Sequence, residues 1–154
     1  MERTLVLGGL GPLDRLAGLL GQLAATVFST SGKAICSGRL IGATPSQAEP
    51  KFAALGSGAG TAVVGDTTLF TEFTVGTWTG YARTSNAGTQ VTTILTNDTY
   101  QNVAVFTAPG AAAVTNAGLF DALTVGNLLI KGDFATINLA LNDTLTLTFK
   151  LQFA

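Results

Sequence analysis

The chain has 154 residues, the length of one ordinary domain, and 47% of them are hydrophobic, enough for a core without disulfide or metal support. Charged residues make up only 11%, and 8 basic against 9 acidic side chains give a net charge of -1 without a block of one sign. This balance argues against a nucleic-acid-binding surface. Low charge and a mean hydropathy of +0.44 predict that some surface is buried between subunits.

The first 49 residues do not follow the pattern of the rest of the chain. Large apolar residues recur at steps of three and four between Pro12 and Phe28, which predicts a short amphipathic helix. They are Leu13, Leu16, Leu19, Leu20, Leu23 and Val27. The apolar stretch 16–28 lacks a preceding basic cluster and is interrupted by polar residues, so we expect neither a secretion signal nor a membrane span.

The Ser-, Gly- and Pro-containing segment 29–50 is predicted to form a strand and an extended connection. Residues 1–49 are therefore expected to form an N-terminal arm or helix with a linker.

From residue 50 onward the pattern changes to one of period two. It is clearest at 145–153, where apolar residues alternate with Thr, Lys and Gln, as in a half-buried strand. Less regular strands are expected at 70–79, 88–96, 99–107 and 128–134, separated by turn residues. We therefore predict a mainly β chain, with an antiparallel, jelly-roll-like β-sandwich over 50–154 and a short helix or extended arm before it.

Residue types that most catalytic sites need are absent or isolated. The chain has no His, and its one cysteine, Cys36, is expected to be a small buried apolar residue. The glycine-rich run 56–60 fits no phosphate-binding pattern. The acids stand singly, so we expect them to close turns and cap strands. They include Asp66, Glu72, Asp121, Asp133 and Asp143. No catalytic residue, metal or cofactor is predicted.

Three aromatic residues are the candidates for ligand contact. Trp78, Tyr81 and Tyr100 could form a platform for a sugar or a base, although aromatics in β-rich sequence more often pack on a sheet. Trp78 is the first of the three to test.

Three motifs after residue 50 resemble bacteriophage virion proteins of the capsid decoration (cement) or tail-fibre-like β-sandwich type. A glycine turn at 50–60 leads into Leu69 and Glu72; a Gly-Leu-Phe-Asp segment occupies 118–121; and an alternating final strand begins at Asp143. The motif residues are Leu69, Glu72, Gly118, Leu119, Phe120, Asp121 and Asp143. Two positions depart from the pattern, namely Ala117, where an acid is expected, and Asn142, where a Gly often stands.

The resemblance implies a decoration protein without catalytic activity. Such a protein is made in the host cytoplasm, joins the virion on the outer surface of the capsid and stabilises it. The implied partners are the major capsid protein and further copies of the chain, as a homotrimer, with neither nucleic acid nor membrane. The candidate interaction residues are Leu13, Leu16, Leu20, Leu23, Trp78 and Tyr81.

Two alternatives stay open. A tail or tail-fibre component would contact the host, through exposed aromatics such as Trp78 or Tyr81, but the chain shows no heptads or fibre repeats. A carbohydrate-binding or carbohydrate-processing β-sandwich module would use Glu72 with one Asp.

Overall fold

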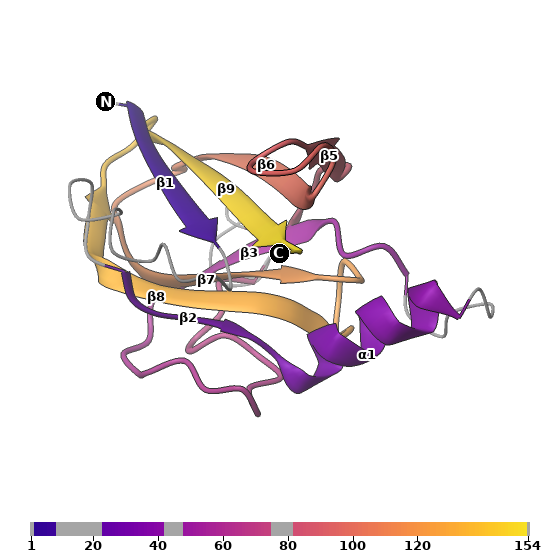
Figure 1. Ribbon diagram of the computed structural model, residues 1–154. Coiled ribbons are helices and arrows are strands. Elements are labelled where there is room, and N and C mark those ends of the chain that lie inside the picture. The colour runs from indigo at the N-terminus through magenta and orange to yellow at the C-terminus, as the bar shows by residue number, and fades with distance from the viewer. Residues whose placement is uncertain (1, 9–22, 42–47, 75–81, 154) are drawn as a thin grey trace.

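The structure is a computed structural model that describes residues 2–8, 23–41, 48–74 and 82–153. Two sheets pack face to face, and a helix lies beside one end of them (Figure 1). This arrangement confirms the prediction of a mainly β, sandwich-like chain.

The first sheet has the strand order β1-β9-β6-β5. Its strands are β1 (Glu2–Gly8), β9 (Thr144–Gln152), β6 (Thr99–Thr107) and β5 (Thr89–Val91). The second sheet has the order β2-β8-β7-β3-β4. Its strands are β2 (Leu23–Phe28), β8 (Leu128–Leu139), β7 (Ala112–Phe120), β3 (Phe52–Gly56) and β4 (Thr84–Ser85). Neighbouring strands run antiparallel, except that β1 is parallel to β9.

The strand β9 shows the predicted alternation. Its apolar residues at 145, 147, 149 and 151 are buried, while the Thr and Lys residues between them are only half-buried. Opposite β9, all nine residues of β6 pair in one continuous register. The predicted strands at 99–107 and 145–153 are therefore confirmed, except that Phe153 lies beyond the end of β9 and is exposed, and β8 extends the one predicted at 128–134.

The main core lies between the two sheets. The first sheet contributes Phe106, Leu147 and Phe149, and the second contributes Leu55 and Leu119, all at most 1% exposed. Burying a side chain of this size contributes about 1.5–3 kcal/mol to stability. This core holds the sheets together.

The segment 57–73 covers the outer face of the second sheet. Its Leu69 packs with Ala54, Phe120 and Leu128 in a second, smaller core. Backbone hydrogen bonds from Ser57 and Gly58 to carbonyls at 71 and 70 fold the segment back on itself. As a result, residues 53–56 of β3 and 116–120 of β7 are buried on both faces.

Two predicted strands are absent or shortened. In the described part of the predicted strand 70–79, the chain forms an isolated bridge at Glu72 rather than a strand, and 75–79 lie outside the described residues. The predicted strand 88–96 is limited to β5, since residues 92–98 fold into a tight turn. That turn is closed by Asp98, which accepts backbone N–H groups from Thr93, Ile94 and Leu95.

The N-terminal part differs from its prediction. Residues 23–28, expected to end a helix, form β2 and pair with β8, while 13–22 lie outside the described residues. The helix α1 occupies Thr30–Leu40, where an extended connection was expected. Ser29 caps it by accepting the backbone N–H of Gly32. Among the described residues, β1 and β2 are outer strands of the two sheets. In the same part of the chain, the helix α1 is neither long enough nor apolar enough to span a membrane.

Candidate functional site

Most of the motif residues meet where the segment 57–73 crosses the second sheet. A Cβ atom on Gly118 would lie 2.9 Å from side-chain atoms of Leu69 and Leu128, so glycine lets that segment approach β7 closely. Phe120 belongs to the same small core, whereas Leu119 points into the main core between the sheets. Motif residues that resemble those of phage virion proteins thus pack the segment 57–73 against the second sheet.

Arg83 joins this cluster to a neighbouring turn. Its Nε and Nη2 donate to the two carboxylate oxygens of Glu72 at 2.7 and 3.0 Å. Its Nη1 donates to the carbonyls of Ala122 and Val125 at 2.8 and 2.6 Å, and the guanidinium lies 3.6 Å from the centroid of the Phe120 ring. An arginine that donates two hydrogen bonds to one carboxylate and stacks on an aromatic ring holds these groups in a defined orientation. Both oxygens of Glu72 are therefore engaged by an arginine.

Asp121 closes the turn that Arg83 contacts. Its Oδ1 accepts the backbone N–H of Asn127 at 2.6 Å, and its Oδ2 accepts the Asn127 side-chain amide at 2.8 Å. The turn contains Val125 and Gly126, both with positive φ. Asp143 lies in a different turn, where it accepts the N–H of Ala140 at 2.9 Å. Both acids occupy the turn-closing positions predicted for them.

A second polar cluster lies beneath the segment 57–73. Lys131 projects from β8, is 0% exposed, and donates to Oδ2 of Asp66 at 2.8 Å. Its Nζ also lies 3.1 Å from the centroid of the Phe70 ring. Although burial alone would raise the pKa of Asp66, the Lys131 ammonium and the N–H of Val63 hold that pKa below its ordinary value.

Asp133 lies two residues further along β8, so its side chain is on the same face as Lys131. Its Oδ2 accepts the backbone N–H of Ala62, while its Oδ1 is buried without a hydrogen-bond partner among the described residues. Burial raises the pKa of the Asp133 carboxyl, against the opposing effects of the Ala62 N–H and the Lys131 charge. Sequence reasoning assigned both acids to turns and missed their meeting with Lys131.

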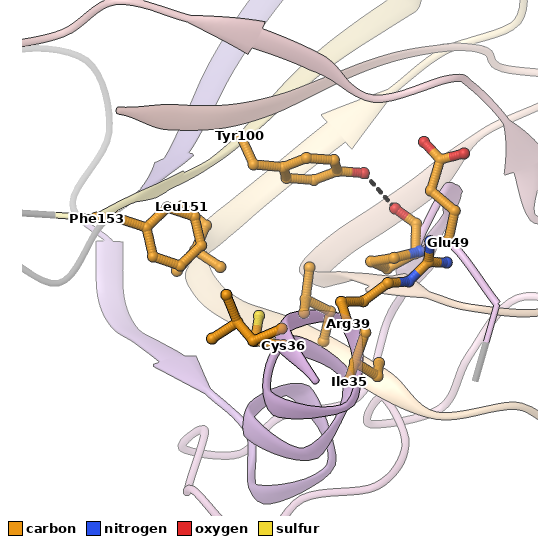
Figure 2. Close-up of a pocket in the computed structure, with 10 residues that line it drawn as sticks. Ile35, Cys36, Arg39, Glu49, Tyr100, Leu151 and Phe153 are labelled. Atoms are coloured by element: carbon orange, nitrogen blue, oxygen red, sulfur yellow. Dashed lines mark hydrogen bonds between the residues drawn. The ribbon is translucent and has the colours of Figure 1, made fainter. Parts of the chain in front are cut away.

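An apolar pocket of about 450 Å³ opens between α1 and the ends of both sheets (Figure 2). It is lined by Ile35, Cys36, Arg39, Leu40, Glu49, Pro50, Tyr100, Leu129, Leu151 and Phe153. The Tyr100 hydroxyl donates to the carbonyl of Pro50 across one wall. Its size and apolar lining suit a small apolar group.

The titratable groups of this pocket are unsuited to nucleophilic chemistry. Burial raises the pKa of the Cys36 thiol, which keeps it protonated at neutral pH. Burial, together with the charge of Glu49, raises the pKa of Tyr100 to about 12. Cys36 is half-buried at the pocket wall, rather than fully buried as predicted.

Exposed apolar side chains lie elsewhere on the surface. On the outer face of the first sheet, Val103 and Val105 are 40% and 54% exposed, and they pair with Thr148 and Thr146 of β9. At one end of this sheet, the 92–98 turn presents Ile94 and Leu95. We call Val103, Val105, Ile94 and Leu95 the apolar surface set. None of these four residues was predicted from the sequence as an interaction residue.

Five of the six predicted interaction residues fall in parts of the chain that the structure does not describe. Leu13, Leu16, Leu20, Trp78 and Tyr81 lie outside the described residues, and Leu23 is the first residue of β2. Within the described ranges, no three His, Cys, Asp or Glu residues are grouped as metal ligands.

Comparison of the chain with protein-family models gives no match, and comparison with curated proteins gives none either.

Proposed function

We propose that the chain is a structural protein of a bacteriophage particle, and specifically a decoration protein that binds the outer surface of the capsid and stabilises it. The observation that carries the proposal is the combination of a β-sandwich that has two buried cores with exposed apolar side chains on its surface. Within the proposal, the apolar surface set is the contact surface for the major capsid protein.

The turn 92–98 supports a contact role because it is tightly held yet apolar at its tip. Asp98 accepts three backbone N–H groups and the Thr99 hydroxyl, and Gln152 of β9 donates to it at 3.0 Å. The tip residues Ile94 and Leu95 are nevertheless 59% and 64% exposed. A preorganised apolar tip loses little conformational entropy on docking, which favours binding.

The outer face of the first sheet supports the same role. Val103 and Val105 stand in one row of β6, flanked by threonines of β9 that carry no charge. Contiguous apolar surface on a domain with so few charges is typical of a protein–protein interface. Such an interface needs on the order of 1,000 Å² in total, so the proposed contact would also include the surface around these side chains.

The arrangement of Glu72 favours this proposal over a carbohydrate-processing module. A glycosidase needs a pair of carboxyl groups free to exchange protons with substrate. Glu72 has both oxygens on Arg83, and Asp121 has both on Asn127. Their contacts are those of structural residues.

The first experiment counts copies of the chain in purified particles of the phage that encodes it, by quantitative mass spectrometry against the major capsid protein. Hundreds of copies per particle are expected. A handful would reassign the chain to the tail or a tail fibre, and none would overturn the proposal of a virion protein.

A second experiment tests the surface. The variant Val103→Lys/Val105→Lys is expected to lose binding to capsids stripped of the chain, while Val63→Lys/Val64→Lys, which changes exposed valines on another segment, retains it. Native mass spectrometry of the free protein reports whether it is the proposed homotrimer. Equal binding by both variants would refute the assigned surface.

A further inference from the structure

The buried cluster beneath the segment 57–73 has features of a covalent cross-link site. The Lys131 amine lies 2.8 Å from a carboxylate oxygen of Asp66, is 0% exposed, and sits against the Phe70 ring. The Asp133 carboxyl shares its face of β8, with one oxygen left unpaired among the described residues. We propose that Lys131 and Asp66 join spontaneously in an isopeptide bond, with Asp133 transferring the protons.

Burial makes the ion pair a poor end state. Lys131 is 0% exposed, and removing its ammonium from water costs several kcal/mol, which the attraction of the Asp66 carboxylate, 17% exposed, repays only in part. Lys131 has Asp66 as its one hydrogen-bonded acid among the described residues. Converting the pair to a neutral amide removes the buried ammonium together with the partly buried carboxylate.

Proximity supplies the other requirement. Amines and carboxylates condense negligibly when free in water, but groups fixed in reacting geometry reach effective concentrations of about 10⁵–10⁸ M. The sheet fixes Lys131, because β8 pairs on both sides with β2 and β7. Asp66 is fixed by the N–H of Val63, which it accepts at 3.1 Å.

The reaction balances without any co-reactant. The pair begins as an ammonium and a carboxylate, and a proton moves from Lys131 Nζ toward the carboxyl group of Asp66. The neutral nitrogen then attacks Cγ of Asp66, the N–Cγ bond forms, and one Cγ–O bond breaks. The departing oxygen leaves as water with two of the three ammonium protons, and the third stays on the amide.

Asp133 is suited to carry these protons. Because burial raises the pKa of its carboxyl, this group can hold a proton where an ordinary aspartate would not. It can give that proton to the departing oxygen of Asp66 and recover one from the nitrogen. Its unpaired Oδ1 leaves one oxygen available for this exchange.

Intact-mass spectrometry of the full-length, denatured protein tests the proposal directly. The wild-type mass is expected to be lower than the sequence mass by one water. Trypsin should fail to cleave after Lys131 and should release a branched peptide in which segment 52–83 is joined to segment 84–150. A wild-type mass equal to the sequence mass, or a water loss mapped to another place, would overturn the proposal.

Variants separate the roles within the cluster. Lys131→Arg keeps the positive charge but lacks an amine nucleophile, and is expected to have the full sequence mass. Asp133→Asn keeps the shape and is expected to slow water loss at least tenfold in freshly refolded protein. Glu72→Gln, which alters the separate Glu72–Arg83 pair, is the control and should still lose one water. The branched peptide of the wild-type protein decides the question. A variant that fails to fold would therefore not change the conclusion.

Discussion

The ion pair between Arg83 and Glu72 gives the sharpest test of how the motif residues hold the fold. Replacing Arg83 by Met removes four hydrogen bonds while keeping an apolar stem over Phe120. The Glu72 carboxylate, with only 18% of its side chain exposed, would lose its arginine partner, and the carbonyls of Ala122 and Val125 would lose their donor.

The expected loss follows from these contacts. Removing one partner of a buried ion pair costs about 3–5 kcal/mol, and the partial exposure of Glu72 places the effect near the lower limit, at about 3 kcal/mol. Glu72→Gln keeps one neutral acceptor for Arg83 but sets an amide NH2 group against the other donating N–H of the guanidinium, so it should lose about 1–3 kcal/mol. The double variant should lose less than the sum of the two, since the shared contact can be lost only once.

Urea unfolding followed by far-ultraviolet circular dichroism measures these free energies. Lys33→Met, which removes an exposed cation from α1, is the control and should change stability by no more than about 0.5 kcal/mol. Hydrogen exchange at the Asn127 amide, which Asp121 accepts, should also accelerate in Arg83→Met. A loss below about 1 kcal/mol in Arg83→Met would refute the idea that this pair holds the turn in place.

Two further predictions concern titration. In Tyr81→Phe, which leaves Tyr100 as the one tyrosine, ultraviolet absorbance should show the phenol ionising at a pKa of about 12, and a midpoint near 10 would contradict its burial. Although burial would raise the pKa of Asp98, the N–H groups of the 92–98 turn and the Thr99 hydroxyl hold it far below its ordinary range. Its contribution to stability is therefore present above about pH 4 and is lost as pH falls toward the native pKa, so the stability gap between wild type and Asp98→Asn should narrow below that pH. A gap independent of pH would contradict this assignment.

The strands that could be predicted from the sequence are those with one buried and one solvent-facing side. In β9, Leu147 and Phe149 are buried while Thr148 between them is not, so the period of two is visible in the letters. The strand β6 shows the same alternation at Ala104 and Phe106. Both were predicted close to their observed bounds.

The strand β3 and the second half of β7 were missed because both of their faces are covered. In β3, Leu55 enters the main core and Ala54 the smaller one, so the run has no polar alternation. A short apolar run of this kind does not distinguish a strand from a helix or a loop. The cover is the segment 57–73, whose position depends on contacts far along the chain.

Near the N-terminus, a helix was predicted where the strand β2 lies, and an extended connection where the helix α1 lies, for a related reason. Leu23 and Val27 are four residues apart, a spacing that fits a helical stripe, yet their backbone pairs with β8. The Ser- and Gly-containing segment of α1 has low helix propensity, and it is held by packing against β8. A Cβ on Gly32 would collide with the carbonyl of Leu129, so a residue that weakens an isolated helix permits this packing.

The clusters around Arg83 and Lys131 join residues that are far apart in the sequence, and local sequence patterns do not predict such contacts. The motif residues at 69, 72, 118 and 120 do gather, but their anchor Arg83 belongs to no motif, and Asp143 lies in a separate turn. Lys131 and Asp66 are 65 residues apart and meet because the segment 57–73 folds over β8. Separation of this size leaves no trace in local periodicity.

The parallel pairing of β1 with β9 has a consequence for the order of folding. Residues 2–8 pair with 144–150, so segments near the two ends of a 154-residue chain must meet. During synthesis β1 leaves the ribosome long before β9, and contacts between segments so distant in the sequence form slowly. A chain that stalls before residue 144 would hold a strand-forming segment with unpaired backbone groups, the kind of edge that pairs with neighbouring nascent chains.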